Sequence, residues 1–149
     1  DRDVLTQSGV KALIVLIGIN DIGGLSREGE VTPEKRTQVV TGLIAAYRQI
    51  AIRAHERGIR VIGATILPCG GTKVYRSDAD ADADRQAVNA WIRGSGVFDA
   101  VVDFDRVTRD PAHPERLLPA YDSGDQLHPS PAGYKAMGEA VAIGALVKR

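Results

Sequence analysis

Cysteine is almost absent from this sequence, because Cys69 is the only one among 149 residues. An intrachain disulfide and a zinc site built from several cysteines are therefore excluded. An excess charge of one sign is also missing, since 19 Lys and Arg residues offset 19 Asp and Glu residues. Proteins that bind nucleic acid or anionic membrane surfaces need a positive excess, so we expect neither partner.

Long hydrophobic runs are missing as well. The longest, from Ala12 to Ile17, has the length of a strand, far short of the roughly 20 apolar residues that span a bilayer. The first residues include neither an initiator methionine nor the pattern of a signal peptide. The segment from Leu5 to Gly9 is typical of a helix end, with Gly9 directly after the last turn. We therefore expect residues 1–149 to form a single domain that is incomplete at its N-terminus.

Three runs rich in Val, Ile and Ala predict strands. The run from Val10 to Ile17 and residues 60–67 have little polar alternation, the pattern of strands that are buried on both faces of a parallel sheet. Residues 100–104 form a shorter third run.

Helices are predicted between and after these strands. Thr32 precedes a proline and a glutamate, which together favour a helix start, and Gly58 is expected to end that helix. Ser77 is the expected cap of a second helix. Ser130 and the proline after it start a last helix. Its apolar side chains are expected to face inward, namely Tyr134, Met137, Val141 and Leu146.

Strands that alternate with helices imply a parallel sheet covered by helices on both faces, an α/β fold with three layers. The segments from Gly18 to about Val31 and from Asp105 to His128 are expected to be loops. In sheets of this kind, sites form at the carboxyl ends of the strands. Two polar clusters lie at such places: Gly18-Ile19-Asn20-Asp21 after the first strand, and Asp122-Ser123-Gly124-Asp125-Gln126-Leu127-His128-Pro129 before the last helix.

The pair of clusters resembles a known family. Gly-x-Asn-Asp at a strand end, followed by Asp-x-x-His-Pro before a closing helix, is similar to the SGNH (GDSL) esterases and acylhydrolases. Pro131-Ala132-Gly133-Tyr134 resembles the start of that family's last helix. The resemblance implies a three-layer α/β/α fold with a parallel, flavodoxin-like sheet whose N-terminal strands are absent from this chain.

The resemblance also implies a role for each site residue. His128 would be the general base that deprotonates a serine hydroxyl, and Asp125 would orient its imidazole. Asn20 would donate its side-chain amide to the oxyanion of the tetrahedral intermediate. Gly18 and Asp21 would support the loop around Asn20.

The family's nucleophile has no counterpart in these 149 residues. It lies in an N-terminal Gly-Asp-Ser motif, and no serine here follows Gly-Asp. The family's glycine oxyanion donor is missing as well. We therefore expect a Ser-His-Asp ester hydrolase whose serine comes from a segment outside this chain, and a chain that is inactive alone.

Further expectations follow from the resemblance. The substrate would be a small-molecule or carbohydrate ester, no metal or organic cofactor is implied, and the location would be extracellular or periplasmic. Without the first strands, the strand from Val10 to Ile17 is an apolar edge, which recruits another strand. We expect a missing N-terminal segment or a second copy in a homodimer to cover it.

Other interpretations stay open. The chain could be a non-catalytic α/β binding or assembly module that uses the same edge. Asp122, Asp125 and His128 could bind a metal ion, with Asp103 or Asp105 nearby. Asn and Asp also favour ordinary turns, so the cluster after the first strand could be one.

Overall fold

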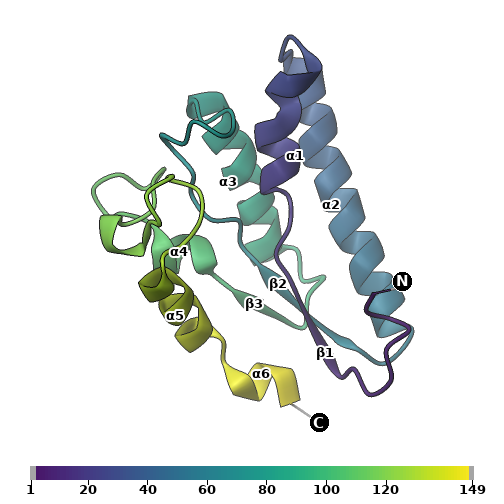
Figure 1. Cartoon of the computed structure of the whole chain (residues 1–149). Helices are drawn as coiled ribbons and strands as arrows, with labels where there is room; N and C mark the ends of the chain where they lie inside the picture. The colour runs from purple at the N-terminus through teal and green to yellow at the C-terminus, as the bar shows by residue number, and fades with distance from the viewer. Residues whose placement is uncertain (1–2, 148–149) are drawn as a thin grey trace.

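A parallel sheet organises the computed structural model, which describes residues 3–147 (Figure 1). Its strands lie in the order β1 (Ala12–Val15), β2 (Arg60–Ala64) and β3 (Ala100–Val102). Val15 pairs with Gly63, and Gly63 pairs with Val101. All three strands therefore end at the same edge of the sheet, as the sequence predicts.

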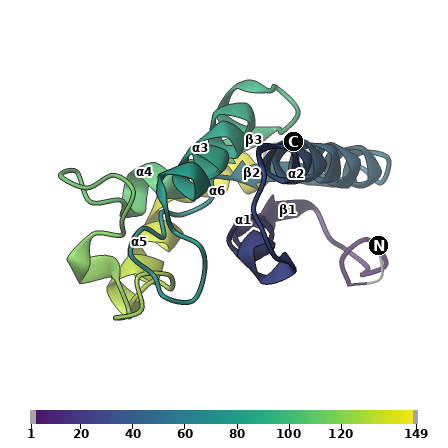
Figure 2. The ribbon, with the colours of Figure 1, turned by 90° about the horizontal axis from the view of Figure 1, so that it is seen from above.

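Helices cover both faces of this sheet. The helices α2 (Pro33–His55) and α3 (Ala79–Gly94) lie beside each other on one face (Figures 1 and 2). Helix α5 (Pro131–Ala140) and the short α6 (Ile143–Val147) pack against the other face. The predicted α/β class with three layers is confirmed. None of the helices within residues 3–147 combines the length and the apolar character that crossing a membrane requires.

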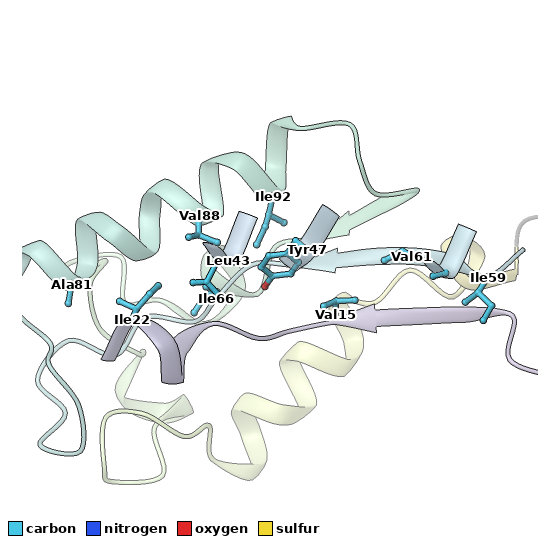
Figure 3. Packing of buried hydrophobic residues seen from close by; sticks show 11 residues of the cluster. Val15, Ile22, Leu43, Tyr47, Ile59, Val61, Ile66, Ala81, Val88 and Ile92 are labelled. Atoms are coloured by element: carbon cyan, nitrogen blue, oxygen red, sulfur yellow. The ribbon is translucent and has the colours of Figure 1, made fainter. Parts of the chain in front are cut away.

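The side chains of β2 alternate between two cores, as the period of a strand dictates. Val61 belongs to the buried cluster that also includes Tyr47 of α2 and Val88 of α3 (Figure 3). Ile62 and Ala64 face the other way, toward α4 (Phe104–Thr108) and α5. Both faces of β2 are thus buried, which explains the almost unbroken apolar run in the sequence.

Within the described residues the sheet has two open edges, at β1 and at β3, and the first is the edge that the sequence predicts. β1 pairs with β2 on one side only. Ile14, Leu16 and Ile17 are 37%, 39% and 40% exposed. A groove of about 520 Å³ runs along this edge between β1 and α2.

The N-terminal half differs from the prediction in two places. Residues 3–9 form turns rather than a helix end, although Gly9 has the left-handed φ of 79° that the predicted helix ending would need. The expected loop after Gly18 contains α1 (Ile19–Gly24) and the 3-10 helix η1 (Leu25–Glu28). Two glycines give α1 a low helix propensity, and burial of its Ile22 side chain, 1% exposed, stabilises it instead.

Helix boundaries in the C-terminal half also differ. Asp78, not Ser77, caps α3 by accepting a hydrogen bond from the Ala81 N–H at 2.8 Å. The Ser77 hydroxyl instead donates to the Thr72 carbonyl. The last helix breaks at Val141, which is extended, and Tyr134 points outward with 56% of its surface exposed.

Short helices also interrupt the expected loop between Asp105 and His128. They are α4 and the 3-10 helix η2 (Pro119–Tyr121). The predicted caps Thr32 and Ser130 are confirmed by their hydrogen bonds to the Lys35 and Gly133 N–H groups.

Asp103, directly after β3, binds Thr65 and Arg93 and makes the stability of the fold depend on pH. Burial alone raises the pKa of this carboxyl, but hydrogen bonds from Arg93, the Arg106 N–H and Thr65 outweigh it and lower the pKa to about 2. A lowered pKa in the folded state stabilises the fold above the ordinary value of 3.8, and this contribution is lost as the pH falls toward about 2.

We expect the free energy of unfolding to fall less steeply in Asp103→Asn than in the wild type across that window. Urea denaturation at a series of pH values measures both slopes. Parallel slopes would contradict this account of Asp103.

Candidate active site

Gly18 forms the junction between β1 and the first polar cluster. Its φ of 108° lies in the left-handed region, which favours glycine. A Cβ at this position would also lie 2.9 Å from the Ile66 side chain. The chain can therefore turn sharply into α1, whose first turn carries Asn20 at the carboxyl edge of the sheet.

Tyr47 of α2 holds the same junction in place through a hydrogen bond to Ile17. Its side chain is fully buried, and its hydroxyl donates to the Ile17 carbonyl at 2.9 Å. Burial raises the pKa of Tyr47 to about 12, so the hydroxyl stays protonated and remains a donor. This hydrogen bond fixes the chain one residue before Gly18.

Replacing Tyr47 with phenylalanine should lower the free energy of unfolding by about 0.5–1.5 kcal/mol, because the partly buried hydrogen bond to the Ile17 carbonyl is lost. Urea denaturation measures the change. Tyr134→Phe is the matched control, since this tyrosine is 56% exposed and a surface change of this kind alters stability by about 0.5 kcal/mol or less. Equal losses in the two variants would contradict the anchoring role.

Asp125 and His128 form a close pair on the second cluster. The Asp125 Oδ2 atom lies 2.6 Å from the His128 Nδ1 atom. The hydrogen bond to the His128 ring, together with the His128 and Leu127 N–H groups, holds the pKa of Asp125 well below its usual value. An ionised carboxylate can only accept, so Nδ1 carries a proton, and in the neutral imidazole the Nε2 lone pair is then the base.

The loop that carries this pair is closed by its own hydrogen bonds. The Asp122 Oδ1 atom accepts from the Gly124 and Gln126 N–H groups at 3.0 and 2.9 Å. The Ser123 N–H donates to the His128 carbonyl at 3.0 Å. Gln126 has a left-handed φ of 57°, and its amide nitrogen, turned toward the Gly71 carbonyl, donates to it at 2.9 Å. The pair is thus held rigidly before any substrate binds.

Helix α3 positions a third segment, the chain that follows β2. Asn89 is fully buried; it accepts from the Ile66 N–H at 2.7 Å and donates to the Ile66 carbonyl at 2.9 Å. Arg85 donates to the same carbonyl at 3.0 Å and to Asp105 at 2.5 Å. Ile66 is therefore fixed in place although it lies beyond the last residue of β2.

These three segments surround one cavity of about 160 Å³. Asn20 and His128 both line it, so the structure brings the two polar clusters together at the edge where the strands end. Apolar side chains form most of the remaining lining, and no serine, threonine or cysteine of residues 3–147 is among them. The residues are Leu16, Ile17, Ile19, Asn20, Ile66, Leu67, Tyr75, Leu127, His128, Pro129, Tyr134 and Met137.

Tyr75 lines the cavity, and the sequence does not reveal its contact with Asn20. Its hydroxyl donates to the Asn20 Oδ1 atom at 2.7 Å. Tyr75 belongs to the loop between β2 and α3, 55 residues from Asn20, and no motif or periodicity connects the two. Only the folded chain brings them into contact.

The supporting role predicted for Asp21 does not rest on side-chain hydrogen bonds or ion pairs within the described residues. Asp21 is exposed in the first turn of α1, and its carboxylate makes no hydrogen bond or ion pair with residues 3–147. An acid in the first turn favours a helix through the helix dipole, which is the support that the geometry offers.

The alternative of a metal site at the second cluster finds no support in the part of the chain that the structure describes. No group of three His, Cys, Asp or Glu side chains there is placed to hold an ion. Asp122 uses its carboxylate on backbone N–H groups, and Asp125 uses its own on His128.

Comparisons with known proteins point in one direction. The sequence matches the GDSL-like lipase/acylhydrolase family over residues 1–136. A GDSL-like lipase from Bacteroides thetaiotaomicron has a similar structure, with a TM-score of 0.65 and 22% sequence identity, and the match covers 89% of this chain and 60% of that one. A G-D-S-L family protein from Desulfitobacterium hafniense gives a TM-score of 0.64 at 22% identity, covering 94% and 67% of the two chains.

These structural matches establish the fold alone at such low identity. No curated protein matches the sequence. The chain spans only about 60% of the length of the Bacteroides lipase.

Proposed function

This chain belongs to the GDSL-like lipase/acylhydrolase family, and from that premise we propose that it is the acid–base and oxyanion-binding part of a Ser-His-Asp ester hydrolase. The observation that carries the proposal is the Asp125–His128 pair, 2.6 Å apart, on the same cavity as Asn20. Fixed donors and bases around one apolar cavity are what acyl transfer needs.

The steps follow from the protonation states of the residues. His128 Nε2 takes the proton of an attacking serine hydroxyl while the serine oxygen bonds to the ester carbonyl carbon. Asp125 stabilises the imidazolium that forms, and the Asn20 amide donates to the oxyanion. His128 then returns the proton to the leaving alcohol, and a water molecule repeats the cycle on the acyl-enzyme.

We propose that the serine is supplied by a segment outside these 149 residues, with a strand that pairs along the free edge of β1. The apolar side chains of Ile14, Leu16 and Ile17 favour such a partner, because they are 37–40% exposed beside unpaired backbone groups. The complete enzyme is then the protein that contains both these residues and the serine segment. Its substrate is proposed to be a small-molecule or carbohydrate ester; an extracellular or periplasmic location stays a prediction.

Labelling with a fluorophosphonate probe, followed by intact-mass and peptide mass spectrometry of the protein from its source, tests the proposal. We expect an adduct on a serine outside residues 1–149. An adduct on a serine within them would contradict the supplied nucleophile. If the protein from its source consists of these residues alone, takes no label and cleaves no ester, that result would support the binding or assembly module instead.

A further inference from the structure

Side-chain amides have two chemically different ends, and only one of them can serve an oxyanion. The Nδ2 group of Asn20 can donate a hydrogen bond, whereas Oδ1 can only accept. Asn20 is exposed, so solvent alone would not hold its amide in one orientation. The proposed role of Asn20 therefore needs a second group that fixes which end faces the reacting oxygen.

Tyr75 is placed to do this. Its hydroxyl donates to Asn20 Oδ1 at 2.7 Å, which occupies the accepting end of the amide and leaves Nδ2 on the other branch. Both side chains line the same cavity. A hydroxyl donor on Oδ1 also draws electron density away from Nδ2, because hydrogen bonds along a chain polarise one another.

The tyrosine is itself held against the helix that carries Asn20. A Cβ added to Gly23 of α1 would lie 2.5 Å from the Tyr75 Cβ atom, so glycine is what lets the tyrosine lie directly on this helix. The Arg76 N–H donates to the Gly23 carbonyl at 3.3 Å. The Arg27 guanidinium lies 5.1 Å from the centroid of the Tyr75 ring, within the range of a cation–π interaction.

We propose that Tyr75 is a positioning residue that orients the Asn20 amide toward the oxyanion. The inference rests on the proposed function, because it names a residue that acts on the reaction through Asn20. Tyr75 supplies no proton and makes no bond to the substrate; it fixes the direction in which Nδ2 donates.

The test compares kcat and KM of Tyr75→Phe and the wild type on a short p-nitrophenyl ester, in the complete enzyme. We expect kcat to fall about ten- to hundredfold, the range that small misplacement of a catalytic group produces. KM should stay within about twofold, since a donor that acts on the transition state does not bind the ground state. Tyr121→Phe is the matched control: it also removes one phenolic hydroxyl, and that hydroxyl makes no hydrogen bond with residues 3–147. Its kcat should equal that of the wild type.

A double-mutant cycle separates positioning from a general structural effect. Asn20→Ala should lower kcat about 10²–10³-fold, and Tyr75→Phe should then cause no further loss in the Asn20→Ala background. If the double variant instead lost kcat by the product of the two single losses, the inference would be overturned, because Tyr75 would then act independently of Asn20. Loss of kcat in Asn20→Ala without loss in Tyr75→Phe would overturn the inference alone. Unchanged kcat in Asn20→Ala would overturn the oxyanion role in the proposed function, and with it the inference.

A second pair of variants tests the contact between Tyr75 and α1 without touching the hydroxyl. Gly23→Ala forces the tyrosine ring away, whereas Gly24→Ala adds the same methyl group to the next position, where nothing lies within 4 Å. We expect kcat to fall in Gly23→Ala and to stay at the wild-type value in Gly24→Ala. Equal kcat values in the two variants would contradict the positioning of Tyr75 by this helix.

Discussion

Replacing His128 with alanine should lower kcat/KM for a short p-nitrophenyl ester by about four to six orders of magnitude in the complete enzyme. The imidazole is the only base in the proposed mechanism, and loss of the histidine from a Ser-His-Asp triad has an effect of about this size. Asp125→Asn should cause a loss of about 10⁴-fold, because an amide can stabilise the wrong imidazole tautomer. Initial rates over a range of ester concentrations measure both.

His113→Ala is the control for this prediction. The His113 and His128 side chains are equally exposed, at 63%, but His113 lies away from the cavity and faces Glu115 at 3.8 Å. Its kcat/KM should match the wild type. If His128→Ala retained activity within about tenfold of the wild type, the assignment of the base would be wrong.

Removing the buried carboxylate of Asp105 should produce the largest loss of stability. Asp105 is fully buried and binds Arg85, itself 1% exposed, at 2.5 Å and Arg93 at 2.7 Å. Asp105→Ala removes the carboxylate that faces Arg85 Nη1 in a place that water does not reach, and Asp82, 2.6 Å from Nη2, is the carboxylate that remains on Arg85. Breaking a buried ion pair from one side costs about 3–5 kcal/mol, and urea denaturation should report a loss in that range.

Asp80→Ala is the matched control for the buried pair. The Asp80 side chain is 65% exposed and lies 2.8 Å from Arg36, so the same substitution should cost about 1 kcal/mol or less. Losses of similar size in the two variants would contradict the importance of burial at Asp105. Because Arg85 also binds the Ile66 carbonyl, the Asp105→Ala variant should in addition loosen the wall of the cavity.

Local signals made much of the fold predictable from the sequence. Thr32 and Ser130 cap their helices as expected because the hydrogen bonds of a cap join residues only three apart. Ser77 failed as a cap for a tertiary reason. Asp78 beside it has the same capping ability, and the Ser77 hydroxyl is engaged by the Thr72 carbonyl of the preceding loop.

The site was predictable in part, and for a topological reason. Parallel strands end at one edge of a sheet, so the clusters that hold Asn20 and His128 could be expected to meet there. The contribution of Tyr75 could not be foreseen, because its contact with Asn20 spans 55 residues and depends on where the loop after β2 returns to α1. Helix α1 was missed for the same kind of reason, since packing of Ile22, not propensity, stabilises it.

The closed loop around Asp125 and His128 has a consequence for how the site assembles in time. The hydrogen bonds of Asp122, Ser123 and Asp125 within it join residues no more than five apart along the chain, so little chain entropy is lost in forming them. The contact between Asn20 and Tyr75 requires closure over 55 residues and the prior pairing of two strands, which is the slower kind of step. We therefore expect the acid–base pair to form earlier in folding than the contact between Asn20 and Tyr75.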